Sequence, residues 1–168
     1  MHAEAYLSDV PPLIRFIREL ADYQNELSCI TTTEEKLCQT IAFDPEEFDA
    51  CAAADRISPF RPARVLLAFD NDGVPAGMAL YFYSYVTWHA TPGIYLEDLY
   101  VLPSGGRSGR GKRLMDALGK ELHAVEGERI EWRVLEWNEP SVRFYESLSA
   151  KFMDSWKDMK LEKMDTTR

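Results

Sequence analysis

The most constraining feature of this sequence is a glycine-rich loop between a predicted buried strand and a predicted helix. Residues 94–102 are rich in β-branched and aromatic side chains, which favour a mostly buried strand. Residues 105–111 follow as Gly-Gly-Arg-Ser-Gly-Arg-Gly, and apolar residues at helical spacing across 114–125 predict the helix. In such an arrangement several backbone N–H groups point into one concavity, and the helix adds its positive N-terminal end. The order of elements therefore favours binding of an anion such as phosphate.

Two other interpretations of the loop compete with a phosphate site. One is a tight connector without a ligand. Four cationic side chains in an otherwise acidic chain favour an anion site instead, and they are Arg107, Arg110, Lys112 and Arg113. The other is the nucleoside-triphosphate loop, G-x-x-x-x-G-K-[ST], which the chain matches from Gly106 to Lys112. That match fails at its last position, because Arg113 stands where Ser or Thr would hold magnesium, so a triphosphate-binding module is the weaker alternative.

The other segments predict a mixed α/β domain. The turn Asn71-Asp72-Gly73 between two apolar runs is a strong hairpin signal, and Asn138 before Glu139-Pro140 is typical of a helix start. Helices are expected at about 10–24, after the capping-box residues 31–35, and at 142–148, and strands at 65–69, 77–83, 130–135 and 156–161. No repeat, low-complexity tract or long linker divides the chain, so residues 1–168 are expected to form one domain.

Charge and cysteine usage argue against several classes of protein. Nineteen Lys and Arg against 28 Asp and Glu give a formal net charge of −9, which disfavours nucleic-acid binding and favours a cationic partner. Cys29, Cys38 and Cys51 cannot all pair within one chain, and their spacing is not that of a zinc site. Reduced, buried or half-buried thiols and no metal are expected. The N-terminus lacks a signal-peptide pattern, and no apolar run is long enough to span a membrane, so a soluble cytoplasmic protein without a membrane partner is expected.

Three segments in this order carry a resemblance to a known family. They are Tyr95-Leu96-Glu97-Asp98-Leu99-Tyr100-Val101, the glycine-rich loop, and Glu136-Trp137-Asn138-Glu139-Pro140-Ser141 followed by Phe144-Tyr145-Glu146. The chain resembles the GCN5-related N-acetyltransferases (GNAT) along nearly its whole length, in particular the diamine (spermidine/spermine-type) acetyltransferases and their bacterial relatives. The resemblance implies the GNAT acyl-CoA N-acyltransferase fold, an α/β architecture whose mixed, mostly antiparallel central sheet is flanked by helices, with a splayed strand at the acetyl-CoA cleft. It also implies an acetyl-CoA-dependent N-acetyltransferase.

For the coenzyme, the resemblance implies a loop pattern R/Q-x-x-G-x-G/A whose N–H groups hold the pyrophosphate at the helix start. The pattern falls on Gly106, Gly109 and Gly111, so Gly106 replaces the usual Arg or Gln. A backbone amide of the preceding strand is implied as the donor to the tetrahedral oxyanion. The coenzyme-binding residues that the resemblance implies are Leu99, Tyr100, Val101, Arg107, Ser108, Gly109, Arg110, Gly111, Lys112, Asn138 and Ser141.

Acetyl transfer to an amine needs a base for the ammonium and an acid for the departing thiolate. The resemblance implies Glu97 as the base, acting through water, and Tyr145 as the acid. Glu97 and Asp98 are adjacent in a strand, so their side chains are predicted to point to opposite faces, with Asp98 helping to hold the cationic substrate. The alternatives are that both carboxylates only pair with nearby Arg or Lys, and that Tyr145 is a core side chain.

The resemblance also implies an amine pocket. Its substrate-binding residues are Tyr23, Gln24, Trp88, Asp98 and Glu136. Polyamine enzymes of this branch carry Glu at the position of Gln24, so this chain keeps a hydrogen-bonding group there but loses one negative charge. The expected substrate is the primary amine of a polyamine, a diamine or a lysine-like amino acid, and the expected assembly is a homodimer. A coenzyme-binding protein without catalysis is the alternative.

Overall fold

The computed structural model describes residues 2–44, 57–103 and 109–161, so Cys51, Gly106, Arg107 and Ser108 lie outside the described residues. In chain order the elements are β1 (His2–Glu4), η1 (Leu7–Asp9), α1 (Val10–Tyr23), η2 (Leu27–Cys29), α2 (Glu34–Thr40), β2 (Ala63–Phe69), β3 (Pro75–Val86), β4 (Thr91–Val101), α3 (Arg110–Ala124), β5 (Ile130–Trp132) and α4 (Glu139–Ser147). The backbone packs into two compact units, Met1–Arg133 and Val134–Arg168. That the whole chain is one domain stays a prediction.

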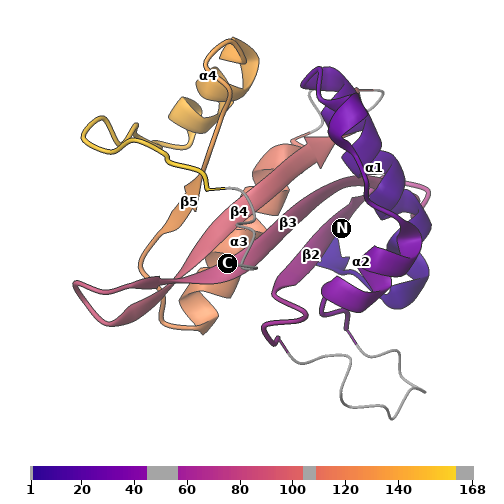
Figure 1. Cartoon of the computed structure of the whole chain (residues 1–168), viewed down its shortest axis with the longest axis horizontal. Coiled ribbons are helices and arrows are strands. Elements are labelled where there is room, and N and C mark those ends of the chain that lie inside the picture. Colours follow the sequence, from indigo (N-terminus) through magenta and orange to yellow (C-terminus); the bar gives the residue numbers. More distant parts are fainter. Residues whose placement is uncertain (1, 45–56, 104–108, 162–168) are drawn as a thin grey trace, which may run out of the picture. The chain divides into compact units, whose positions relative to one another are not determined.

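The first unit is built on a five-stranded sheet in the order β1-β2-β3-β4-β5 (Figure 1). Strands β1 to β4 pair antiparallel with their neighbours, whereas β4 and β5 are parallel. The predicted hairpin joins β2 to β3, and its Gly73 has a φ of +79°, a left-handed conformation that favours glycine. Asp70 Oδ1 accepts hydrogen bonds from the N–H groups of Asp72 and Val74 across this turn. The mixed, mostly antiparallel sheet and the hairpin are thus confirmed.

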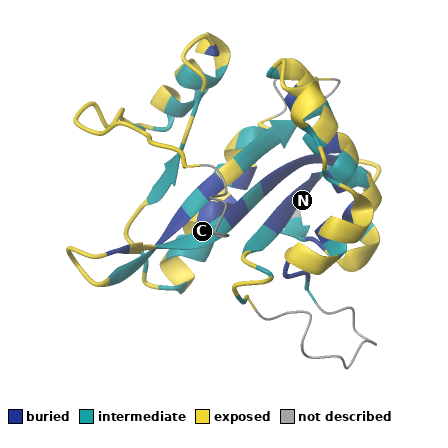
Figure 2. Cartoon of the chain, in the orientation of Figure 1, coloured by how far each residue is buried: buried dark blue, intermediate teal, exposed yellow. Residues whose placement is uncertain are grey.

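Helices cover both faces of this sheet (Figure 1). On the face covered by α1 and α2, here the α1 face, Leu13 and Phe16 belong to one buried cluster with Met78 of β3. On the opposite face, the α3 face, Leu114 and Leu118 belong to a second cluster. The buried residues follow the middle of β2, β3 and β4 (Figure 2). Each fully buried side chain of this size contributes about 1.5–3 kcal/mol, so the two clusters hold the central strands rigidly between the helices.

Most predicted elements are confirmed, and the exceptions are strands. Thr33 caps α2 as expected, since its hydroxyl accepts a hydrogen bond from the N–H of Lys36. The three residues of β1 carry too little pattern for a prediction, and β5 ends at Trp132 instead of residue 135. The predicted strand at 156–161 is wrong. These residues pair with none of the described strands, and an extended segment without a pairing partner is not a strand.

Two of the three cysteines lie in described residues, and neither forms a disulfide. Cys38 in α2 is half-buried, as expected, but Cys29 is exposed. Cys29 belongs to η2, a short connection between α1 and α2 that contributes no buried residue, and its Sγ lies 3.1 Å from Glu26 Oε2. The expected burial of the thiols is therefore wrong for Cys29.

The second unit contains α4 and the chain that follows it. Asn138 is the N-cap of α4, and its Oδ1 accepts a hydrogen bond of 3.3 Å from the N–H of Ser141. Pro140 occupies the first turn, where its missing N–H costs nothing. The helix start predicted at these residues is confirmed. After α4, the described residues of this unit form no further helix or strand.

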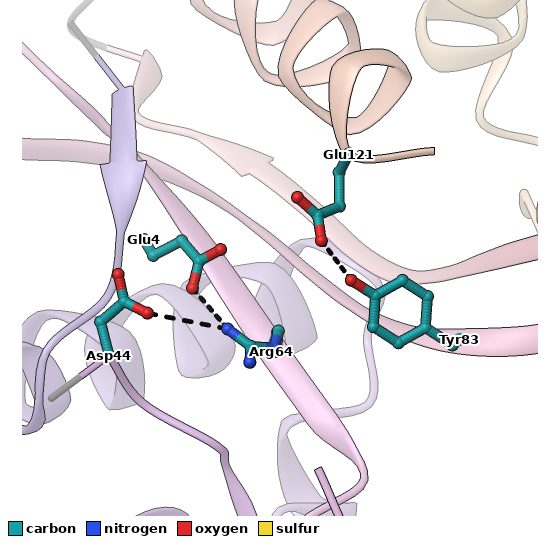
Figure 3. A network of polar contacts seen from close by, with 5 residues as sticks. All are labelled: Glu4, Asp44, Arg64, Tyr83 and Glu121. Carbon is teal, nitrogen blue, oxygen red and sulfur yellow. Dashed lines mark hydrogen bonds and ion pairs between the residues drawn. The ribbon is translucent and has the colours of Figure 1, made fainter. Parts of the chain in front are cut away.

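Half-buried polar side chains from five segments of the first unit form a network of polar contacts (Figure 3). Arg64 of β2 pairs with Glu4 of β1 at 2.6 Å and with Asp44, which follows α2, at 3.7 Å. Tyr83 of β3 donates a hydrogen bond to Glu121 of α3. Burial and then a hydrogen bond with Asp44 raise the pKa of Glu4 to about 7, because together they outweigh the attraction of Arg64. Glu4 is therefore partly protonated near neutral pH.

Replacing Glu4 by Gln should flatten the dependence of stability on pH. The folded-state pKa of about 7 lies above the ordinary value of 4.5. The stabilisation by this group is therefore complete below pH 4.5 and is lost as the pH rises through about 7. We expect the free energy of unfolding to fall by about 1 to 2 kcal/mol because of Glu4 as the pH rises from 5 to 8. Urea unfolding measured at several pH values should show that Glu4→Gln loses this dependence of the free energy of unfolding on pH, because the amide imitates the protonated carboxyl.

Glu35→Gln is the matched control for this experiment. Glu35 is exposed on α2, outside the network, so its replacement changes the net charge equally without touching Arg64. It should keep the wild-type slope. Equal slopes in wild type and Glu4→Gln would contradict the assignment of this pH dependence to Glu4.

Candidate functional site

The pairing of β3 with β4 is interrupted by one extra residue. Leu80 lies opposite Asp98, but the next residue of β3, Tyr81, lies opposite Leu96. Glu97 therefore has no counterpart on β3, which is the arrangement of a β-bulge. A bulge bends its strand and redirects side chains, and here the extra residue is acidic.

The bulge changes the face that one of the two carboxylates occupies. Leu96 and Leu99 both pack in the cluster of the α3 face, although an odd spacing of three would put them on opposite faces of a regular strand. The two residues between them, Glu97 and Asp98, take up the difference. Asp98 lies opposite Leu80, which packs against the cluster of the α1 face. The prediction that Glu97 and Asp98 point to opposite faces is therefore wrong, because strict alternation fails at a bulge and both lie toward the α1 face.

The two carboxylates differ in their environment. Asp98 is half-buried, and burial first and the charge of Glu97 second raise its pKa to about 6. Glu97 is exposed. Among the described residues, no Arg or Lys forms an ion pair with either carboxylate, so the alternative that both only serve a structural ion pair has no support there. Above about pH 6 the pair presents two negative charges that are available to a cationic group.

The same strand has an unpaired edge next to the bulge. β5 pairs with Ile94, Tyr95 and Leu96 only, so within the described part of the chain the following residues of β4 have no partner on that edge. Leu99–Val101 thus offer backbone N–H and C=O groups that a ligand can use. The end of pairing between β4 and β5 corresponds to the splayed strand that the resemblance implies at the coenzyme cleft.

The start of α3 supplies donors for an anion. Gly109 is its N-cap with a φ of +71°, and a Cβ atom built on it would meet nothing within 4 Å. Its carbonyl accepts from the N–H of Arg113 at 3.0 Å, whereas the N–H groups of the first turn have no acceptor inside the helix. Lys112 pairs with Asp116 at 3.0 Å, and Arg110 is half-buried with an Nε that has no acceptor among the described residues. Open space, N–H groups without an acceptor inside the helix, and positive charge fit the pyrophosphate of coenzyme A.

The amine-pocket residues of the first unit are not all brought together. Tyr23 is exposed at the end of α1, and Gln24 follows as its C-cap. Trp88 is 80% exposed in the turn between β3 and β4. Glu97 lies six residues along β4 from its first residue, Thr91, or about 20 Å at the usual rise per residue. The chain therefore does not bring Trp88 beside the bulge carboxylates.

The second unit carries the remaining predicted site residues. Asn138 is buried at the start of α4, Ser141 donates to it, and Tyr145 is half-buried one turn later with its ring 5.2 Å from that of Phe144. Glu136 is exposed. A hollow of about 290 Å³ lies within this unit, lined by Val134, Glu136, Glu139, Val142, Arg143 and Phe152.

Sequence reasoning misses the bulge and one further contact. Two adjacent acidic residues inside an apolar strand are the signal that could indicate the bulge, because a buried strand has no other place for them. The hydroxyl of Tyr100 donates a hydrogen bond of 2.7 Å to Glu19 of α1. The sequence indicates nothing of this contact, since the two residues are far apart in the chain. In the described residues, we find no helix that is long and apolar enough to cross a bilayer.

Comparison with known proteins agrees with this geometry. A family model described as Acetyltransferase (GNAT) family matches residues 26–149. The chain is 30% identical over 151 residues to thialysine N-epsilon-acetyltransferase of Bos taurus, which covers 89% of this chain and 83% of that protein. It is 27% identical over 180 residues to L-ornithine N5-acetyltransferase NATA1 of Arabidopsis thaliana, which covers 89% of this chain and 78% of that protein.

Solved structures share the fold at lower sequence identity. An integron cassette protein from the mobile metagenome of V. cholerae superposes with a TM-score of 0.72 at 20% identity, over 97% of this chain and 92% of that one. An aminoglycoside acetyltransferase from an uncultured soil metagenomic sample, in complex with sisomicin, gives a TM-score of 0.66 at 15% identity, over 100% and 96%. At these identities the likeness concerns the fold alone.

The Gly109→Asp substitution should weaken acetyl-CoA binding more than tenfold, because it puts a side chain and a negative charge at the start of α3. Isothermal titration with acetyl-CoA measures this. Gly73→Asp is the matched control, since Gly73 also has a positive φ, +79°, and open space around its Cβ position, but lies in the β2–β3 turn. Unchanged affinity in a folded Gly109→Asp protein would exclude this site.

Proposed function

Because the chain belongs to the acetyltransferase (GNAT) family, we propose that it moves acetyl from acetyl-CoA to a primary amine of a small cationic substrate. Polyamines, diamines and lysine-like amino acids are the substrate class. The observation that carries this proposal is the pair of carboxylates at the bulge, Glu97 and Asp98, which lie toward one face of the sheet beside an open strand edge. Two negative charges in this position suit a cationic amine.

The coenzyme, when bound, supplies an acyl group activated as a thioester. In this proposal the N–H groups at the start of α3 hold its pyrophosphate, assisted by Arg110 and Lys112. The open edge of β4 at Leu99–Val101 holds the pantetheine arm, and one N–H there donates to the developing oxyanion. Asn138 and Ser141 of the second unit are proposed as further contacts.

Glu97 is the proposed general base. An ammonium group must lose a proton before its nitrogen can attack a carbonyl, and Glu97 is exposed, so a water molecule can relay that proton to its carboxylate. Asp98 holds the cationic substrate beside it. Its raised pKa of about 6 leaves it ionised at neutral pH, where the negative charge is needed.

Tyr145 is the proposed general acid, as the family resemblance implies. Its phenol hydrogen passes to the departing thiolate, and the ring contact with Phe144 supports a defined orientation of the phenol. Tyr23, Gln24, Trp88 and Glu136 are proposed for the amine pocket. Trp88 precedes Thr91, which lies about 20 Å along β4 from Glu97, so Trp88 would serve the pocket of a second subunit. This agrees with the homodimer proposed from the resemblance.

An amine panel tests the proposed function. The purified chain should release free CoA from acetyl-CoA in the presence of spermidine, 1,4-diaminobutane, ornithine or thialysine, measured with a thiol reagent. Acetyl-CoA, and not ATP, should raise the melting temperature, because the loop lacks the hydroxyl that would hold magnesium. Stabilisation by acetyl-CoA without turnover on any amine would instead identify a coenzyme-binding protein.

Variants of the proposed acid and base should lose activity with different dependences on pH. Tyr145→Phe should keep coenzyme affinity and lose about a hundredfold in kcat at every pH, because it removes the proton-donating hydroxyl and keeps the ring. Glu97→Gln should lose most activity at neutral pH and recover partly toward about pH 9, where solvent supplies neutral amine. The measurement is kcat against pH with the best amine of the panel.

Tyr85→Phe, at an exposed position of β3, controls for the loss of a phenol elsewhere and should match wild type. Full activity in Tyr145→Phe would remove Tyr145 from the mechanism. A Glu97→Gln profile parallel to wild type would remove the base.

A further inference from the structure

A carboxylate on α1 faces the bulged strand and has no part in the proposed mechanism. Glu19 Oε2 accepts a hydrogen bond of 2.7 Å from the hydroxyl of Tyr100, which lies two residues beyond Asp98 in β4. The ring of Tyr100 packs against Phe16, with ring centroids 5.7 Å apart. The contact therefore joins α1 to β4 on the α1 face, next to the bulge.

Tyr100 is the proton donor in this contact. Burial and the hydrogen bond to Glu19 raise the pKa of Tyr100 to about 12, so the phenol is a neutral donor at any physiological pH. Arg15 Nε is 3.9 Å from Glu19 Oε1, and the Arg15 guanidinium also lies 5.0 Å from the centre of the Phe16 ring. Glu19 is also partly open to solvent, with 39% of its side chain exposed. A ligand cation can reach it.

Glu19 shares a face with proposed amine-site residues of both β4 and α1. Residues two apart on a strand are about 7 Å apart and share a face, so Tyr100 and Asp98 point to the same side of β4. Tyr23 lies four residues after Glu19, on the same face of α1. Glu19 thus shares the α1 face with the bulge carboxylates and shares one face of α1 with Tyr23, so it adds a third carboxylate to Glu97 and Asp98 there.

We propose that Glu19, positioned by the hydroxyl of Tyr100, is a specificity-determining residue that contacts the second ammonium group of a dibasic amine. The reacting amine then lies at Glu97 and Asp98. This inference rests on the proposed function. It gives the Tyr100 side chain a role besides the one proposed for its backbone.

The Glu19→Gln substitution tests this role. Gln keeps an oxygen for the hydroxyl of Tyr100 but removes the charge. We expect the KM for 1,4-diaminobutane to rise about five- to tenfold with little change in kcat, whereas kcat/KM for butylamine, which has no second ammonium, stays within about twofold of wild type. Tyr100→Phe should shift the ratio of the two kcat/KM values in the same direction by a smaller factor, because Glu19 is then free to turn to Arg15.

Glu35→Gln on α2 is the control, since it removes one exposed negative charge away from the α1–β4 contact and should leave the ratio unchanged. Equal losses on both amines in Glu19→Gln, or no loss on either, would overturn the inference and leave the proposed function intact. A Tyr100→Phe protein with a lower melting temperature and an unchanged ratio would overturn the positioning role of Tyr100. The proposed function itself fails only if wild type acetylates no amine.

Discussion

The single extra residue in β4 is the constraint on which the candidate site depends. With regular pairing, Glu97 and Asp98 would point to opposite faces, and one of them would enter the apolar layer under α3. The bulge allows Leu96 and Leu99 to pack on the α3 face together and leaves both carboxylates toward the α1 face. Residues 96–99 therefore fill the core on the α3 face and place two carboxylates on the α1 face, where a cationic amine can bind.

Packing on both faces keeps the bulge in place. A bulge weakens the ladder locally, and the loss is offset by the buried side chains around it, from Met78 under α1 to Leu114 under α3. On the other edge of β4, pairing with β5 stops at Leu96. The strand is thus paired on one edge and open beyond Leu96 on the other, where we propose that the coenzyme arm binds.

The pKa of each half-buried carboxyl in this acidic chain depends on its immediate surroundings. Asp98 and Glu4 both have raised pKa values, of about 6 and about 7, because burial penalises the ionised form of each. Glu4 has Arg64 beside it, whereas the charge that acts on Asp98 is the like charge of Glu97. A pair of carboxylates that no described Arg or Lys neutralises is costly to hold in a fold, and a cationic substrate would relieve that cost.

The sequence by itself determined the local structure and the family. Helical spacing, caps such as Thr33 and Asn138, and the Asn-Asp-Gly turn are short-range signals, and the structure confirms them. The roles proposed for Glu97 and Tyr145 come from the resemblance and stay predictions. Only the tertiary structure decided the bulge at Glu97, the parting of β4 from β5, and the contact of Glu19 with Tyr100. Each of these depends on which residues of distant segments lie opposite one another, and strand register is set by the packing of whole faces and not by neighbours in the chain.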